Sequence, residues 1–436
     1  MTGSTRVEEL LVYRKFKDAK VFDNMVWVME NLDYDGSEQY GMDTLRGVYY
    51  DCISGLVEMA GSYGFEGNLW HNYLTYLLVN HENVFSTSCE IVGKVEGSIN
   101  DIARHDFEIF RGLYAFDLGE IEKKTGITAM RCLMDYRNID RSSKTFNKRI
   151  RDRICSLTLL LEQSEDVDEF MQHMIDFYKD FGVGKLGLHK AFRVERTDGG
   201  VEIVPIRNIA HVHLDDLVGY EIAKKKLIDN TEAFVSGRKA NNCLLFGDAG
   251  TGKSSSIKGI LNQYYERGLR IIEIYKHQFQ ELNDVIAQIK NRNYKFIIYM
   301  DDLSFEDFEI EYKYLKAVIE GGLEKKPDNV LIYATSNRRH LVREKFSDKE
   351  DRRDDLHSSD TVQEKLSLVN RFGVQIFFCA PDKKEFQNIV RVLAEKNGVT
   401  LPEEELLLEA NKWELSHGGL SGRTAQQFID YLLGQM

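Results

Sequence analysis

The stretch Gly247-Asp-Ala-Gly-Thr-Gly252-Lys253-Ser254 decides how the second half of this chain folds. An apolar run, Cys243-Leu-Leu-Phe246, comes directly before it, and apolar residues with a helical spacing follow it as far as Tyr264. This order of strand, glycine-rich loop and helix is the context that a phosphate-binding loop requires. Glycines let consecutive backbone N–H groups point at one anion, and the N-terminus of the helix adds positive charge. The stretch therefore predicts a site for a nucleoside triphosphate.

Two side chains of this stretch have expected roles. Lys253 could reach the β- and γ-phosphates, and the Ser254 hydroxyl could bind Mg²⁺. The alternative is a glycine-rich surface turn, which the flanking strand and helix disfavour. The residues expected to contact the nucleotide here are Gly247, Asp248, Ala249, Gly250, Thr251, Gly252, Lys253 and Ser254.

Composition narrows the class of protein. The chain has 436 residues, of which 43% are hydrophobic and only 4 are prolines, which is typical of a globular protein with two or three domains. The net charge of -13 speaks against non-specific binding of nucleic acid over the whole surface, although a local basic patch remains compatible. Six cysteines without Cys-x-x-Cys spacing suggest neither a zinc site nor a redox pair.

The sequence also predicts the cellular location of the protein. Its N-terminus has no apolar secretory core, and no run of residues is long enough to span a bilayer. We therefore expect a cytoplasmic protein without a membrane contact.

Patterns along the chain predict its domains. Stripes of apolar residues with a helical period mark the first part, and residues 69–79 are apolar nearly all round, as in a helix buried inside a bundle. The glycine-rich run 181–187 is interpreted as a hinge, and alternating residues around Thr197-Asp-Gly-Gly200 predict a β-hairpin. The expected segments are residues 1–180 (helical N-terminal domain, which we expect to bind a protein partner), 181–210 (connector and β-hairpin), 211–380 (nucleotide-binding α/β subdomain) and 381–436 (helical lid).

A segment upstream of the phosphate loop is a second candidate for contact with the nucleotide. His213-Leu-Asp-Asp-Leu-Val218-Gly219-Tyr220 precedes a predicted helix that leads into the loop. Val218 and Gly219 could pack against the base and the ribose. An ordinary helix cap at Asp215 or Asp216 explains the same spacing nearly as well.

Polar residues follow two further apolar runs. The first run ends in Asp301 and Asp302, and the second ends in Ser336 and Asn337. Because the carboxyl ends of parallel strands meet at one edge of a sheet, we expect these residues beside the phosphate loop. Asp301 would hold Mg²⁺, Asp302 would act as general base or orient the attacking water, and Asn337 would position water near the γ-phosphate. A turn cap is the alternative for the two aspartates.

Two arginines are candidates for contact with phosphate. Arg371 stands just before the apolar run 374–378, where we expect the ligand edge of the sheet. It could serve as an arginine finger on a neighbour's nucleotide, which raises rates by roughly 10³ to 10⁵; a salt bridge to a nearby acid is the alternative. Arg423 lies in the first turn of the last predicted helix and could sense the γ-phosphate.

The residues after Asn337 fit more than one binding partner. Arg338, Arg339 and His340 could contact phosphate, an adjacent subunit or nucleic acid. The run between Lys345 and Glu364 is crowded with charges of both signs, which is typical of an exposed loop.

Taken in order, these motifs resemble those of AAA+ ATPases. The matching elements are Walker A (Gly247 to Ser254), Walker B (Asp301 and Asp302), sensor 1 (Asn337), the arginine finger (Arg371) and sensor 2 (Arg423). More narrowly, Asp301-Asp-Leu-Ser-Phe305, Tyr333-Ala-Thr-Ser-Asn-Arg-Arg-His-Leu341 and Glu364-Lys-Leu-Ser-Leu-Val-Asn-Arg-Phe-Gly373 resemble a bacterial group of AAA+ proteins of unknown function.

The resemblance implies an α/β fold in which a five-stranded parallel sheet carries a helical lid. It also implies Mg²⁺-ATP as the ligand and self-association in which one subunit completes another's site. Asp302 departs from the pattern, because many members have glutamate there. The first hypothesis is thus an ATPase that remodels or loads a macromolecular partner, and the alternative is a slow nucleotide-dependent switch or scaffold with weak hydrolysis.

Overall fold

The computed structural model describes most of the chain, and its described residues form two compact units, Met1–His189 and Lys190–Met436. The described residues are 5–17, 19–32, 39–129, 131–138, 146–207, 209–305, 311–320, 327–337, 341 and 368–435.

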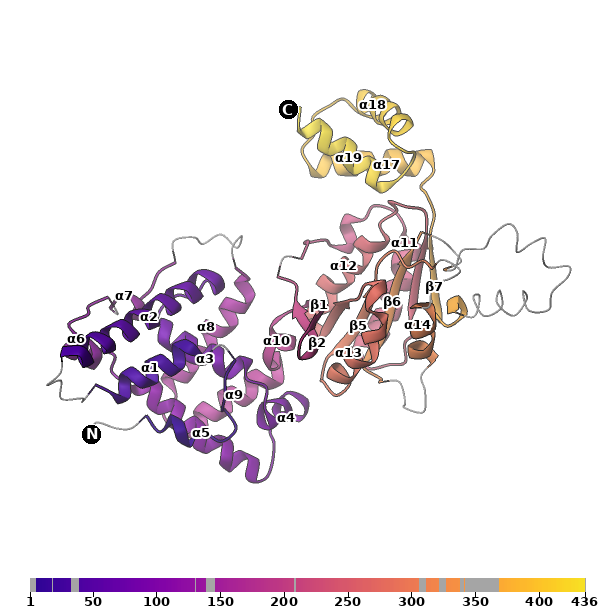
Figure 1. Ribbon diagram of the computed structural model, residues 1–436. Helices are drawn as coiled ribbons and strands as arrows, with labels where there is room; N and C mark the ends of the chain where they lie inside the picture. Colours follow the sequence, from indigo (N-terminus) through magenta and orange to yellow (C-terminus); the bar gives the residue numbers. More distant parts are fainter. Residues whose placement is uncertain are drawn as a thin grey trace. The chain divides into compact units, whose positions relative to one another are not determined.

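The first unit is built from helices (Figure 1). They are α1 (Lys20–Glu30), α2 (Gln39–Tyr63), α3 (Leu69–Asn80), α4 (Val84–Val92), α5 (Ser98–Ala115), α6 (Gly119–Thr125), α7 (Arg131–Met134), α8 (Lys148–Gln163), α9 (Val167–Phe181) and α10 (Gly184–Leu188), with a short 3₁₀ turn η1 (Val7–Glu9) before them.

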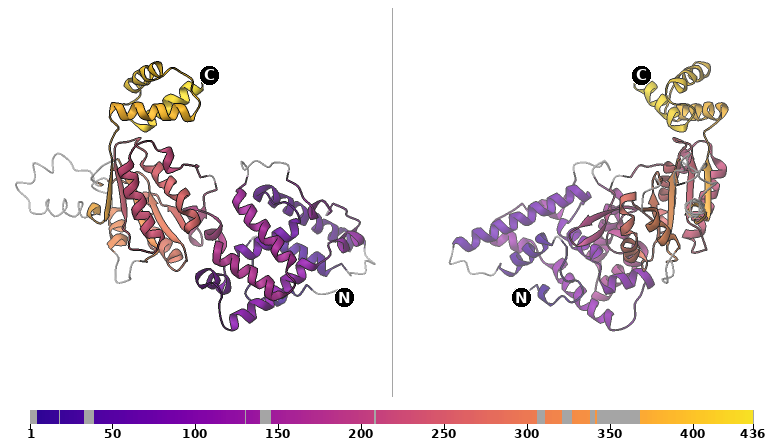
Figure 2. Two further views of the ribbon diagram at one scale, coloured as in Figure 1. Left: turned by 180° about the vertical axis from the view of Figure 1, so that it is seen from behind. Right: turned by 45° about the vertical axis from the view of Figure 1, so that its right-hand side comes forward.

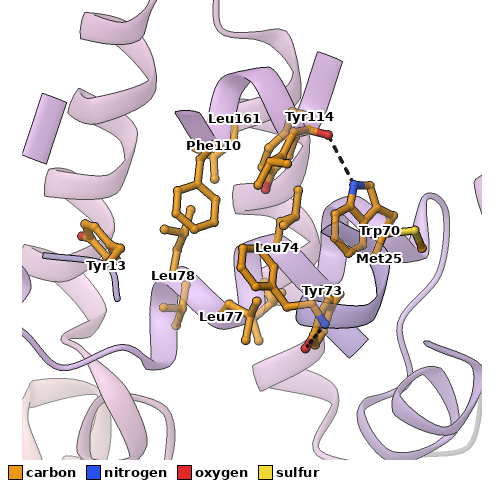
Figure 3. Packing of buried hydrophobic residues seen from close by; sticks show 14 of the residues in the cluster. Tyr13, Met25, Trp70, Tyr73, Leu74, Leu77, Leu78, Phe110, Tyr114 and Leu161 are labelled. Carbon is orange, nitrogen blue, oxygen red and sulfur yellow. Dashed lines mark hydrogen bonds between the residues drawn. The ribbon is translucent and has the colours of Figure 1, made fainter. Parts of the chain in front are cut away.

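Helix α3 lies in the centre of the first unit. Nearly all of its residues are buried, as the apolar run 69–79 predicted. Figure 3 shows Trp70 and Leu74 of this helix packed among side chains from other helices, including Phe110 and Leu161. Trp70 Nε1 donates to the backbone oxygen of Leu113 at 3.3 Å, so the one polar atom of this large side chain is satisfied.

The second unit contains a mainly parallel sheet. Within the described residues its strand order is β2-β1-β4-β5-β6-β3-β7. Only the β1–β2 pair is antiparallel, and every other neighbouring pair is parallel. The strands are β1 (Ala191–Thr197), β2 (Gly200–Pro205), β3 (Cys243–Gly247), β4 (Leu269–Glu273), β5 (Lys295–Met300), β6 (Val330–Ser336) and β7 (Val374–Phe378).

The predicted hairpin is part of the sheet. Residues 191–193 of β1 pair in parallel with residues 271–273 of β4, so the hairpin extends the expected five-stranded sheet. Phe192 and Val194 on β1 are buried, and burial of this apolar face favours the pairing. The glycine-rich run 181–187, interpreted as a hinge, overlaps α10, and most of its residues are buried. The four segments expected from the sequence stay a prediction.

Helices lie on both faces of the sheet. Helices α11 (Glu221–Val235) and α12 (Lys253–Tyr264) pack against one face, where Ile271, Ile297 and Tyr333 contribute to a shared core. Helices α13 (Leu282–Ile289) and α14 (Glu311–Glu320) lie over the other face (Figures 1 and 2). The short turns η2 (Leu214–Asp216) and η3 (Tyr265–Arg267) contact α12 on the first face, and η4 (Lys276–Glu281) contacts α13 and α14 on the second.

The chain ends in three helices, α17 (Lys383–Lys396), α18 (Glu403–Ser416) and α19 (Gly422–Leu433). They enclose a small core of their own around Phe386, Val390 and Phe428. A parallel α/β sheet followed by a helical lid confirms the predicted fold class. Among the described residues, no helix combines the length and apolar character needed to cross a bilayer.

Candidate functional site

The phosphate loop joins β3 to α12 and is held against the neighbouring edge strand. Gly247 has a φ of 133°, and a Cβ atom there would collide with the carbonyl oxygen of Phe378. The backbone N–H of Asp248 donates to that same oxygen at 3.0 Å. The Asp248 carboxylate accepts from the backbone N–H of Ala380 at 2.8 Å. Glycine is therefore required at 247, and the loop is fixed at both its backbone and its first side chain.

Lys253 begins α12 and turns back over the loop. Its ammonium donates to the backbone oxygens of Gly247 at 2.9 Å and Asp248 at 2.6 Å. Burial lowers the pKa of Lys253 from its ordinary value, and this is opposed by the nearby carboxylates of Asp248, Asp302 and Asp301. The Lys253 ammonium is thus held within the curve of the phosphate loop.

Asp301 follows β5 and lies beside the loop, as predicted. Its Oδ1 accepts from the Ser254 hydroxyl at 2.7 Å, from the Tyr299 hydroxyl at 2.6 Å and from the Thr335 hydroxyl at 2.6 Å. Burial raises the pKa of Asp301, but these hydrogen bonds from Thr335, Tyr299 and Ser254 outweigh burial and leave it below its ordinary value. Asp301 is therefore a carboxylate at neutral pH.

Asp302 is positioned by the adjacent strand β6. Its backbone is in the left-handed region, with a φ of 49°. The backbone N–H donates to the Thr335 hydroxyl at 2.9 Å, and the side-chain amide of Asn337 donates to Oδ1 at 2.8 Å. The structure therefore brings Asn337 to the same edge as the two aspartates, while their chemical roles stay a prediction.

The lid meets the phosphate loop directly. The backbone N–H of Arg423, in the first turn of α19, donates to the backbone oxygen of Gly250 at 3.1 Å. Ser421 caps this helix by accepting from the backbone N–H of Thr424. A Cβ atom at Gly250 would come within 2.9 Å of the Ser421 hydroxyl, so the close approach depends on glycine at this position.

These parts surround one cavity of about 630 Å³, a size typical of sites for small molecules and cofactors. The predicted residues that line it are Val218, Ala249, Gly250, Thr251, Gly252, Lys253, Ser254, Asp301, Asp302, Asn337 and Arg423. Gly219 lies between Val218 and Tyr220, which both line the cavity, and Gly247 and Asp248 lie at the base of the loop.

Sequence reasoning missed several residues of the cavity. Leu217, Ile389 and Leu393 supply apolar lining, and Gln426 and Gln427 line it from α19. The two glutamines lie three and four residues after Arg423, a helical spacing that puts them on the same face and could have identified them. Thr335, which also lines the cavity, and Tyr299, which donates to Asp301, were missed because each fits the pattern of an ordinary strand residue.

Arg371 does not lie at the ligand edge of the sheet, so this expectation was wrong. Strand β7 is parallel to β3, and a residue before β7 therefore lies at the amino edge, opposite the phosphate loop. There the Val374 backbone N–H donates to the oxygen of Asn242, just before β3. The Arg371 guanidinium pairs with the Glu320 carboxylate at the end of α14. The salt bridge that the sequence left as an alternative is thus present in this chain.

Some predicted residues lie outside the described part of the chain. They are Arg338, Arg339, His340 and the charged run between Lys345 and Glu364. A contact of the two arginines with phosphate, another subunit or nucleic acid stays a prediction.

The donor set beside the loop fits Mg²⁺. A serine hydroxyl and an ionised carboxylate lie 2.7 Å apart, and Mg²⁺ prefers oxygen ligands of this kind, completed by phosphate oxygens and water. Ser254 and Asp301 are therefore the residues that would hold such an ion.

Comparison with known proteins gives a family. Residues 187–436 match the family described as "Protein of unknown function (DUF815)". Among solved structures, a variant of Thermotoga maritima RuvB is 18% identical, with a TM-score of 0.36, over 50% of this chain and 63% of that chain. The Thermotoga maritima RuvB Holliday junction branch migration motor is 16% identical, with a TM-score of 0.32, over 50% of this chain and 71% of that chain.

The present chain thus spans less than two thirds of the first of these RuvB chains. No curated protein matches it. The family match confirms a group of proteins of unknown function, as the narrower motifs indicated, and the sheet with its lid is the α/β fold that the resemblance to AAA+ proteins implied.

Proposed function

This chain belongs to the family described as protein of unknown function (DUF815), and we propose that it is an ATPase that binds and hydrolyses Mg²⁺-ATP to remodel or load a macromolecular partner. One observation carries the proposal. A single cavity is lined by the phosphate loop, by Asp301 and Asp302 after β5, by Asn337 after β6 and by Arg423 of the lid. Cationic, acidic and amide groups that converge in this way suit transfer of a phosphoryl group to water.

Each group has a role that follows from its chemistry. The loop N–H groups and Lys253 would bind the β- and γ-phosphates, and Arg423 would contact the γ-phosphate from the lid. Mg²⁺, held by Ser254 and Asp301, would neutralise phosphate charge. Asp302 would orient the attacking water and accept its proton, and Asn337 would keep the Asp302 carboxylate in place through the bond at 2.8 Å.

Self-association is the second part of the proposal. Arg371 lies at the edge of the sheet opposite its own cavity, so it can act only on the nucleotide of a second copy of the chain. To do so, its guanidinium must leave Glu320. We further propose that the first unit, a helical body with its own core, holds the protein partner.

A slow nucleotide-dependent switch or scaffold is the second candidate. Two observations favour it: Asp302 has a shorter side chain than glutamate, and Arg371 is paired within its own chain. In this alternative, binding of ATP rather than its turnover would order an assembly, and hydrolysis would be weak.

The rate of phosphate release, measured over a range of protein concentrations, separates the two candidates. The ATPase proposal expects a rate per chain that rises with concentration and falls by about 10³-fold in Arg371→Ala, the lower end of the effect of an arginine finger. Glu320→Ala is the matched variant, because it frees Arg371 and should not lower the rate. Binding of ATP with a negligible rate at every concentration would favour the switch.

A further inference from the structure

We propose that Tyr299 and Thr335 are positioning residues, which hold one oxygen of the Asp301 carboxylate so that the other oxygen is presented to the bound cation. The inference rests on the proposed Mg²⁺-ATP site and adds two residues to it.

The two hydroxyls reach Asp301 from different strands. Tyr299 lies two residues before Asp301 at the end of β5, so both side chains are on the same side of the strand. Tyr299 pairs with Tyr333 in the register of β5 and β6, and Thr335 is therefore beside Asp301. The two hydroxyl oxygens lie 2.6 Å from Oδ1, which is typical of a hydroxyl that donates to a charged acceptor.

All three side-chain hydrogen bonds that Asp301 accepts among the described residues end on this one oxygen. A carboxylate oxygen offers about two lone-pair directions, so three donors leave Oδ1 no capacity for a cation. Ser254 is itself an expected cation ligand and can exchange its bond for one to the ion. Tyr299 and Thr335 are not expected to bind the cation, so their hydroxyls keep Oδ1 occupied.

The hydroxyls are not required to fill space. Tyr299 is 5% exposed and its ring belongs to the core under α11 and α12, where phenylalanine would pack in the same way. Threonine at 335 does more than donate, because its oxygen also accepts from the backbone N–H of Asp302 at 2.9 Å. One hydroxyl on β6 thus ties the Asp301 side chain to the turn that carries Asp302.

The test measures cation binding rather than turnover. Mn²⁺ replaces Mg²⁺, and its binding to the ADP-loaded full-length protein is followed through the electron paramagnetic resonance signal of free Mn²⁺. Tyr299→Phe should weaken Mn²⁺ binding by about tenfold, the lower end of the effect of removing a partner of a metal ligand. Its ADP affinity in excess EDTA should stay at the wild-type value, because the loop and Lys253 are untouched.

Tyr333→Phe is the matched control. Its hydroxyl is also buried between β6 and a helix, but it bonds to Asn230 and Thr231 instead of Asp301. This variant should keep the wild-type affinity for Mn²⁺. Equal weakening in both tyrosine variants would overturn the inference, because the effect would then come from general loosening of the core.

Threonine offers an independent pair of variants. Thr335→Val removes the hydroxyl at nearly constant volume and should weaken Mn²⁺ binding, whereas Thr335→Ser keeps the hydroxyl and should restore it. If the wild type binds Mn²⁺ and ADP while Tyr299→Phe and Thr335→Val bind both as tightly, the inference is wrong and the proposed function stands. If the wild type binds no nucleotide, the proposed function is wrong and the inference goes with it.

Discussion

At the scale of single residues, Asp301 joins the phosphate loop to two strands, because its Oδ1 accepts from the hydroxyls of Ser254, Tyr299 and Thr335. Asp301 and Asn337 were predicted to meet because parallel strands end at one edge, and both line the same cavity. The hydrogen bonds to Asp301 could not be predicted. In an apolar strand, a tyrosine that only packs in the core and a tyrosine that donates to a carboxylate have the same sequence pattern. Which of its neighbours a buried hydroxyl contacts depends on register between strands that are distant in the sequence.

Asp302 is the residue whose charge should matter most to turnover. Asp302→Asn keeps the side-chain shape, can still bond to Asn337 and tolerates the left-handed backbone at 302. Loss of the base should lower the rate of phosphate release by about 10²-fold or more. ATP binding, measured by calorimetry, should remain. A variant that hydrolyses ATP at the wild-type rate would remove Asp302 from the reaction.

Gly247 is expected to be needed for folding as well as for binding. Gly247→Ala forces a Cβ atom against the Phe378 carbonyl oxygen at a φ of 133°, so it should destabilise the second unit by about 3 kcal/mol or more. Gly237→Ala is the control, since its φ is 74° but no atom lies within 4 Å of the added Cβ. It should cost about 1 kcal/mol. Thermal unfolding measures the stability of the two variants. An equal loss of stability in both would show that a local shift of the backbone relieves the collision.

At the scale of elements, the periodicity of the sequence predicted the strands and helices. It did not predict which strands pair, or at which edge of the sheet a residue beside a strand lies. The hairpin at residues 191–205 was recognised from its turn, whereas its pairing with β4 depends on burial of Phe192 against the sheet. The edge at which Arg371 lies follows from the direction of β7 relative to β3. A parallel arrangement puts the residues before a strand at the edge opposite the phosphate loop, so Arg371 cannot lie beside that loop.

A buried carboxylate on α5 stabilises the first unit. The buried Asp106 carboxylate on α5 accepts from the backbone N–H groups of Leu11, Val12 and Tyr13, at distances between 2.8 and 3.1 Å. It thereby fixes the N-terminal segment to the helix bundle. Asp106→Ala leaves these donors without their acceptor and should reduce the free energy of unfolding by about 3 kcal/mol.

Denaturation in urea, followed by tryptophan fluorescence, measures this loss, because Trp70 is buried in the same unit. Glu108→Ala is the control on the same helix, since Glu108 is exposed. It should change the free energy of unfolding by less than about 0.5 kcal/mol. An Asp106→Ala protein as stable as the control would show that the segment is held by its apolar contacts alone.

At the scale of the whole molecule, the described residues form two units with separate cores, and the phosphate loop, the carboxylates and the lid arginine all belong to the second. The matched family also covers only that second part, residues 187–436. One nucleotide site per chain is therefore expected. The role proposed for the first unit, binding of the partner, is the part of the proposal for which the motifs give no evidence.

The central claim is that main-chain N–H groups, the Lys253 ammonium and a divalent cation gather a triphosphate in this cavity. Isothermal titration calorimetry of the full-length chain with Mg²⁺-ATP tests it most directly. The account predicts about one molecule bound per chain, and a loss of at least about tenfold in affinity for Lys253→Ala, as expected when a charged hydrogen bond to phosphate is removed. No heat of binding to the wild type, or the same affinity in Lys253→Ala, would contradict it.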